Sequence, residues 1–141
     1  MKKTLLLSLV LMTLTSLFNV HAQSCYNSYN SQIGKIESDG TIRDRYNSTV
    51  GKFESNGTVR DRYNATIGKI ESDGTIRNRY NSTIGKVEND GTVRDRYNST
   101  LGKVEKDGTI RNRYNSSIGK ASNVNKNQAG VYFFFFDEMN K

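Results

Sequence analysis

The chain has few of the residues on which most catalytic chemistry depends. Its only histidine, His21, lies in an N-terminal stretch that we expect to be removed, and its only cysteine is Cys25. Histidine-based acid–base catalysis and histidine metal ligation are therefore not expected. One cysteine forms no internal disulfide, which leaves Cys25 free, cross-linked to another chain or lipidated. The sequence predicts a protein that is not an enzyme and needs no cofactor or metal.

Residues 1–22 have the pattern of a secretory signal peptide. Lys2 and Lys3 precede an apolar run at residues 5–18, and residues 20–22 supply the small side chains of a cleavage site. An uncleaved membrane anchor is the alternative, but the run is shorter than the roughly 20 apolar residues of a span. The sequence predicts cleavage after Ala22 and export to the periplasm or the extracellular space.

The charge of the exported part is mildly basic. Removing Lys2 and Lys3 leaves 19 basic and 14 acidic residues, a net charge of +5. Such a surface favours anionic partners, for example an acidic polysaccharide or another cell-surface component, but it equally fits an ordinary soluble protein that its charge keeps from self-association. No nucleic acid is expected as a partner of an exported protein.

Five nearly identical 17-residue repeats occupy residues 29–113. Each copy begins with tyrosine and follows the pattern Y-N-[SA]-x-[IVL]-G-K-[IVF]-E-x-[DN]-G-T-[IV]-R-[DN]-R. Residues 23–28 form a short lead-in, and a partial sixth copy begins at Tyr114 and departs from the pattern at Ala121. A pattern matched five times specifies a repeat architecture.

Each repeat is predicted to be a β-hairpin, because an Asp-Gly or Asn-Gly turn separates two β-branched runs. In the first copy a three-residue loop with Gly40 in the left-handed conformation sets Ile36 opposite Ile42. The link to the next hairpin contains Asn47, which tolerates the left-handed conformation. This register predicts one face made of Gly34, Ile36, Ile42 and Asp44, and an opposite face made of Ile33, Lys35, Arg43 and Arg45.

Single hairpins are marginal in water, so the copies must pack on each other. An open β-solenoid is one arrangement, but it usually carries altered end repeats, whereas these copies are uniform. Uniformity favours an all-β closed ring of five hairpins. The count of five and the block IGKIESDGTIRDRYN resemble the bacterial five-fold β-flower proteins, small exported proteins built of five hairpin petals. The resemblance implies the ring and the export, and it implies no catalytic or ligand-binding residue.

The C-terminal region, residues 114–141, ends in an aromatic segment. A polar loop at residues 121–128 leads into six consecutive apolar residues at 131–136. An apolar run without alternation is typical of a strand buried on both faces. We expect this strand to pair with residues 118–121 and to close or fill the ring. The alternative is an exposed aromatic patch for a membrane or a partner.

Two arginines per repeat are the candidate binding residues. Because the two arginines of a repeat are two residues apart on a predicted strand, each pair is expected to point to one face. A closed ring then presents ten guanidinium groups suited to carboxylate, sulfate or phosphate. These candidates are Arg43, Arg45, Arg60, Arg62, Arg77, Arg79, Arg94, Arg96, Arg111 and Arg113. The competing and favoured interpretation is that they form ion pairs with Glu37, Glu54, Glu71, Glu88 and Glu105.

The sequence supports two hypotheses for the function of the protein. The first is an exported, non-enzymatic structural or binding module of unknown ligand. The alternative is a lectin-like binder of anionic glycans, which uses the arginine face together with residues of the Tyr46 type.

Overall fold

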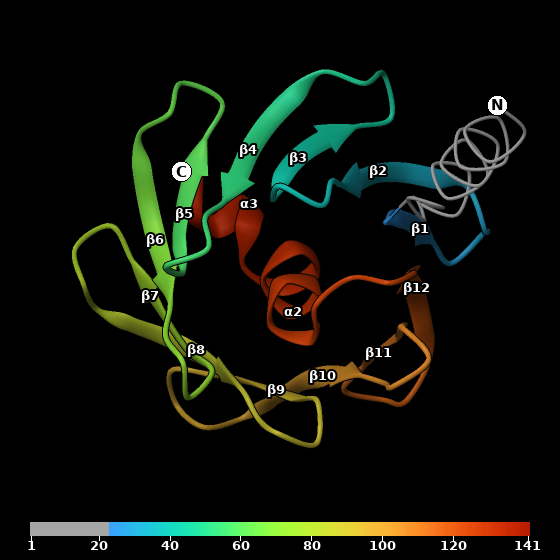
Figure 1. Cartoon of the computed structure of the whole chain (residues 1–141). Coiled ribbons are helices and arrows are strands. Elements are labelled where there is room, and N and C mark those ends of the chain that lie inside the picture. The colour runs from blue at the N-terminus through green and yellow to red at the C-terminus, as the bar shows by residue number, and fades with distance from the viewer. Residues whose placement is uncertain (1–22) are drawn as a thin grey trace, which may run out of the picture.

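A computed structural model describes residues 23–141, and the predicted signal peptide lies outside this part. Within it, twelve antiparallel strands form one closed barrel, and two helices lie inside the ring of strands (Figure 1). The closed ring is thus confirmed, and the open β-solenoid is not supported. The elements are β1 (Ser24–Asn27), β2 (Gln32–Ile36), β3 (Thr41–Asp44), β4 (Thr49–Phe53), β5 (Thr58–Asp61), β6 (Thr66–Ile70), β7 (Thr75–Asn78), β8 (Thr83–Val87), β9 (Thr92–Asp95), β10 (Thr100–Val104), β11 (Thr109–Asn112), β12 (Ser117–Ala121), α2 (Lys126–Phe134) and α3 (Phe136–Met139).

The β2–β3 hairpin shows how each repeat turns. Ile36 pairs with Ile42 across the two strands. Between them, the Gly40 amide donates a 2.9 Å hydrogen bond to the Glu37 carbonyl, and Gly40 has a φ of 90°. The predicted three-residue loop with a left-handed glycine is therefore confirmed. The other four continuous hairpins have the same pairing.

An aspartate stabilises most of these turns. The Asp39 carboxylate accepts a 2.9 Å hydrogen bond from the Thr41 amide. This bond, joined by one from the Thr41 hydroxyl, lowers the pKa of Asp39 below its ordinary value. The same contacts lower the pKa of the equivalent carboxylates, Asp73, Asp90 and Asp107.

Replacing these four aspartates with asparagine should make the fold less sensitive to acid. A carboxylate whose pKa is lower in the folded chain stabilises the fold above its unfolded pKa, about 4. That contribution is lost as the pH falls through the folded pKa. Thermal melts from about pH 7 to about pH 3 should therefore show a smaller fall in melting temperature for the variant.

The second repeat supplies the internal control for this prediction. There Asn56 takes the place of the aspartate, and its side-chain oxygen accepts a 2.9 Å hydrogen bond from the Thr58 amide. Asparagine therefore preserves the turn, and parent and variant should melt alike near neutral pH. Equal loss of melting temperature in acid would show that the turn carboxylates do not couple the fold to pH.

A β-bulge recurs in the first strand of every hairpin. In β4, Thr49 and Gly51 pair with adjacent residues of β3, which leaves Val50 as the extra residue. Side chains of a regular strand alternate between the two faces of the sheet, and a bulge interrupts this alternation. Ile33 and the residues equivalent to it consequently pack against the core, and Ile67 is fully buried. The prediction that Ile33 shares the outer face with Lys35 is therefore wrong.

The first and last strands of the described chain pair in the same way as the two strands of a hairpin, although no turn joins them, and we call this pair the sixth hairpin. β1 pairs with β12, and Cys25 lies opposite Ala121 as Ile42 lies opposite Ile36. The Ser122 amide also donates a 3.0 Å hydrogen bond to the Ser24 carbonyl. The five predicted hairpins are present, but a ring of five does not describe the barrel, because the predicted lead-in and the partial sixth repeat complete it. Open strand edges are thereby removed.

The aromatic C-terminal segment is helical, so the prediction of a closing strand is wrong. Asn125 caps α2, because its side-chain oxygen accepts hydrogen bonds from the amides of Asn127 and Gln128. Consecutive residues of a helix point in directions about 100° apart. Six apolar residues in a row therefore cover a helix on all sides, and a helix that is apolar all round is buried. We call residues 126–139 the plug.

Six glycines, one on the first strand of each hairpin, receive six side chains of the plug. A Cβ added at Gly51 would lie 2.7 Å from Cζ of Phe136, closer than such atoms pack. Missing side chains in the wall thus make room for large side chains in the centre. The pairs are Gly34 with Tyr132, Gly51 with Phe136, Gly68 with Met139, Gly85 with Phe135, Gly102 with Phe134 and Gly119 with Phe133. The prediction that the aromatic segment fills the ring is confirmed, with a helix in place of a strand.

Candidate functional site

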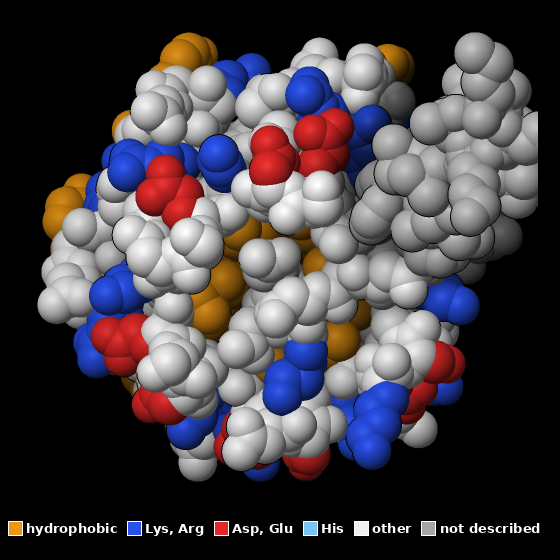
Figure 2. Space-filling model, in the orientation of Figure 1, with side chains coloured by type: hydrophobic (Ala, Val, Ile, Leu, Met, Phe, Trp, Pro, Cys, Tyr) orange, Lys and Arg blue, Asp and Glu red, His pale blue; other side chains and the backbone are white. Residues whose placement is uncertain are grey.

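The first arginine of every repeat forms an ion pair within its own hairpin. Nε of Arg43 lies 2.7 Å from Oε1 of Glu37, and both side chains are about one-third exposed. The same pair recurs at 2.7–2.8 Å for Arg60 with Glu54, Arg77 with Glu71, Arg94 with Glu88 and Arg111 with Glu105. Figure 2 shows Lys and Arg side chains next to Asp and Glu side chains at several places around the ring. The ion-pair interpretation is confirmed for these five arginines.

The remaining hydrogen bonds of Arg43 tie the hairpin to the next strand. Its Nη1 donates to the Asn47 carbonyl at 3.2 Å and to the Thr49 hydroxyl at 3.1 Å. The guanidinium thus connects β3, its partner strand and the following turn. Three of the five N–H donors of Arg43 are therefore used within the wall.

The second arginine of each repeat lies in a turn. β3 ends at Asp44, so Arg45 belongs to the link between hairpins and does not share a strand face with Arg43. The prediction that each arginine pair points to one face is therefore wrong. All five turn arginines lie at one end of the barrel, because every link from an odd to an even strand returns at that end.

The five turn arginines have different surroundings. Cζ of Arg45 lies 5.2 Å from the centre of the Tyr46 ring, and Arg113 lies similarly over Tyr114. Arg79 donates a 3.1 Å hydrogen bond to the Met139 carbonyl, and Arg96 pairs with Glu138 at 3.2 Å. Two arginines thus hold the end of the plug on one side of the ring.

A tyrosine follows each turn arginine and projects into solvent. In the described part of the chain, six tyrosines at equivalent positions are 76–87% exposed. We call this set the tyrosine rim, and it consists of Tyr29, Tyr46, Tyr63, Tyr80, Tyr97 and Tyr114. The repeat pattern shows these tyrosines, but only the closed barrel places all six on one end. None of these six aromatic rings belongs to the core, so the tyrosine rim is an exposed aromatic surface at one end of the barrel.

The rim turns are held in one geometry by local hydrogen bonds. Oδ1 of Asp44 accepts hydrogen bonds from the amides of Tyr46 and Ser48, at 2.9 and 3.0 Å. Asn47 has a φ of 67°, which confirms the predicted left-handed conformation. The same hydrogen bond and the same left-handed asparagine recur in each turn, so the six rim turns have similar backbone geometry.

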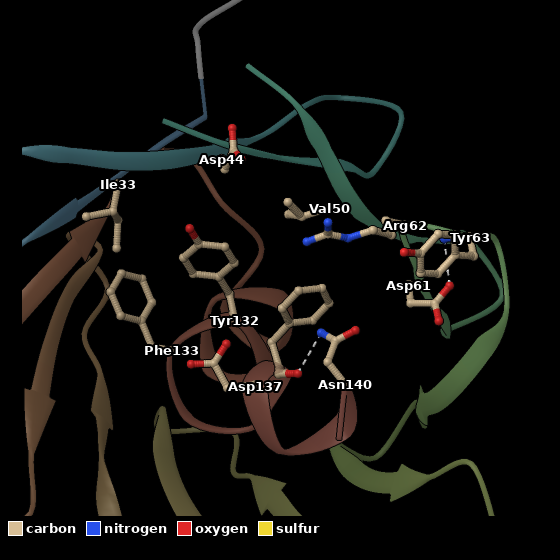
Figure 3. Close-up of a pocket in the computed structure, with 11 residues that line it drawn as sticks. Ile33, Asp44, Val50, Asp61, Arg62, Tyr63, Tyr132, Phe133, Asp137 and Asn140 are labelled. Atoms are coloured by element: carbon tan, nitrogen blue, oxygen red, sulfur yellow. Dashed lines mark hydrogen bonds between the residues drawn. The ribbon is translucent and has the colours of Figure 1, made fainter. Parts of the chain in front are cut away.

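A cavity of about 640 Å³ opens at the tyrosine rim, between the wall and the end of the plug (Figure 3). Tyr132 and Phe136 of the plug form one side of it, and Asp44, Asp61 and Arg62 of the rim turns form another. We call it the rim cavity. No sequence pattern indicates this cavity, because it depends on how the plug sits in the barrel.

Other reactive groups are few in residues 23–141. Cys25 is fully buried in the wall, and burial raises the pKa of its thiol to about 12, so no thiolate nucleophile is available. Such burial also leaves no room for a lipid or an intermolecular link on this side chain. No group of three or more His, Cys, Asp or Glu side chains there is arranged to hold a metal ion.

The helices of residues 23–141 are too short or too polar for any of them to cross a membrane.

Comparison with known proteins agrees with this architecture. No curated protein and no solved structure matches the chain significantly. The model of a family described as 5-fold beta-flower protein matches residues 22–137, which is most of the chain and includes all twelve strands. The chain therefore belongs to the 5-fold beta-flower proteins.

Proposed function

We propose that this chain is an exported, non-enzymatic binding module that contacts its ligand through the tyrosine rim. The observation that carries the proposal is the repetition of one exposed tyrosine at six equivalent places on one end of the barrel. Tyrosine supplies a large and rigid contact surface with both an apolar ring and a polar hydroxyl. Export is part of the proposal because residues 1–22 have the pattern of a signal peptide.

The ligand class that suits this rim best is an extended anionic glycan. Five of the six tyrosines follow an arginine, and guanidinium groups suit carboxylate or sulfate. The net positive charge of the exported part adds a longer-range attraction. A polymer that repeats one sugar unit could occupy several equivalent turns of one rim, so that weak single contacts combine into stronger binding.

Loss of the tyrosine rim should weaken this binding at least about tenfold. Replacing all six rim tyrosines with serine removes exposed rings that pack against nothing in the core, so the fold should remain. Affinity for a uronate or sulfated oligosaccharide should fall at least about tenfold, measured by titration calorimetry at low salt. The assay uses the exported form, whose intact mass also shows whether it begins at Gln23.

Two variants of equal charge separate a specific rim from general positive charge. One replaces the five turn arginines with glutamine: Arg45, Arg62, Arg79, Arg96 and Arg113. The other replaces five wall lysines with glutamine: Lys35, Lys52, Lys69, Lys86 and Lys103. Added salt should weaken binding by the parent, and only the arginine variant should lose it. Equal losses in both variants, or no saturable binding by the parent, would contradict the proposal.

A further inference from the structure

The rim cavity exists because the plug covers the ring unevenly. Arg79 and Arg96 hold the end of the plug near β7 and β9. On the other side, next to β2 and β4, the same end of the plug leaves a space of about 640 Å³. Volumes of this size are typical of pockets that bind small molecules. Five of the six rim turns carry an arginine and a tyrosine, and the plug borders this cavity at the turn that carries Arg62 and Tyr63.

Apolar and aromatic groups form the inner wall of the cavity. Ile33 and Val50 line it from the barrel, and Tyr132 and Phe136 line it from the plug. The rings of Tyr132 and Phe136 lie 6.5 Å apart and are inclined by only 22°. Figure 3 shows the Tyr132 ring in the middle of the site, with its hydroxyl on the side where Ile33 and Asp44 lie. This oxygen lies next to Gly34 of the wall. Within residues 23–141 this hydroxyl has no hydrogen-bond partner at all. A flat ligand could stack against these rings.

Carboxylates are the main polar groups around this wall. Oδ1 of Asp61 accepts hydrogen bonds from the amides of Tyr63 and Ala65, while its second oxygen has no partner within residues 23–141. Asp44 has the same arrangement. Asp137 of α3 also lines the cavity and accepts no hydrogen bond from the described residues. Several carboxylate oxygens are therefore available to accept hydrogen bonds from a ligand.

Hydrogen-bond donors are present but fewer. Arg62 lines the cavity, and no hydrogen bond or ion pair joins it to another residue in the described part of the chain. Its side chain extends toward Val50 in Figure 3. Asn140 also lines the cavity, where its amide donates a 2.9 Å hydrogen bond to the Phe136 carbonyl. With three carboxylates and one guanidinium, the lining is net negative, which disfavours an acidic ligand.

We propose that the rim cavity binds one or two units of a neutral sugar. A sugar ring presents an apolar face to the aromatic wall and several hydroxyl donors to the carboxylates of Asp44, Asp61 and Asp137. Arg62 donates to ring or hydroxyl oxygens. This site goes beyond the proposed contact of the rim with anionic glycans, because it is single, net negative and built partly from the plug.

Titration calorimetry with neutral di- and trisaccharides of hexoses and N-acetylhexosamines tests the proposal. We expect saturable binding of at least one of them at one site per chain, with little change on adding salt. Asp61→Asn removes a charged acceptor and should weaken this binding about tenfold. The turn should survive, because Asn78 and Asn112 occupy the equivalent position in other repeats.

A matched variant on the far side of the ring is the control. Asp95 holds the equivalent turn but lines no part of the rim cavity, so Asp95→Asn should leave neutral-sugar binding unchanged. Equal effects of Asp61→Asn and Asp95→Asn would overturn the proposal. The absence of binding by every neutral probe, or tighter binding of an amino sugar or an acidic sugar at the same site, would overturn it as well.

Binding of anionic glycans by the tyrosine rim and binding of a neutral sugar in the rim cavity can be tested separately. Replacing Tyr80, Tyr97 and Tyr114 with serine changes rim positions away from the cavity, so it should weaken anionic-glycan binding and leave neutral-sugar binding intact. Asp61→Asn should do the reverse. If the tyrosine variant also removes neutral-sugar binding, the sugar is bound by the rim and the cavity proposal is wrong.

Discussion

Removing residues 131–141 should leave a chain that does not fold cooperatively. The truncation takes away all six plug side chains that meet the glycines of the wall, from Tyr132 to Met139. Burial of each large apolar side chain contributes on the order of 2 kcal/mol, so the combined loss is on the order of 10 kcal/mol. A small domain has a total stability of about 5–15 kcal/mol. Circular dichroism melts of the truncated and parent proteins should therefore show a transition only in the parent.

A shorter truncation is the control for the plug. Ending the chain at Met139 removes only Asn140 and Lys141, which are not among the six side chains facing the glycines. This protein should melt close to the parent. If the chain lacking residues 131–141 shows an unchanged transition, the plug is not the core of the barrel, and the aromatic segment would return to its alternative interpretation as a contact surface.

Deleting one repeat, residues 63–79, should also abolish cooperative folding. The deletion removes β6 and β7 and, with them, Gly68, which faces Met139. Because the diameter of a barrel grows with its number of strands, a ring with two fewer strands is too narrow for the same plug. The remaining strands would have to close around six side chains with five glycines, or leave an open edge. Thermal melts should show a broad or missing transition.

Replacing residues 63–79 with a second copy of residues 80–96 gives a matched control of the same length. The exchange keeps twelve strands and the glycine, and it alters core residues only from Ile70 to valine and Ile76 to valine, changes that usually cost about 1 kcal/mol each. This protein should fold and melt within several degrees of the parent. A deleted protein that melts as sharply and nearly as high as the parent would show that the ring is not a closed unit.

Local chemistry made the hairpins predictable. The turn at Asp39 and Gly40 admits few loop geometries, and only one of them puts Ile36 opposite Ile42. The regular spacing of Glu37 and Arg43 across that turn likewise predicts their ion pair. Each of these features depends on residues within a single repeat, so the sequence of that repeat contains the information needed.

The candidate site was predictable only in part. The sequence pointed to the arginines, and five of them proved to be ion-paired within the wall, while the other five lie in turns at the tyrosine rim. The rim cavity could not be foreseen. It is lined by Asp44 and Asp61 of two repeats and by Tyr132 of the plug, which lie far apart in the sequence and meet only in the closed barrel.

By itself, the sequence determined the 17-residue period, the hairpin register, the ion pairs and a closed arrangement filled by an aromatic segment. Only the tertiary structure decided how the ring closes and what shape that segment takes. β1 bears little resemblance to the repeats and becomes a strand because β12 and β2 offer it open edges. Residues 131–136 carry no periodicity that separates a buried strand from a buried helix. A helix is selected because the glycines around the barrel leave space on every side of a central axis, and only a helix directs consecutive side chains all the way round.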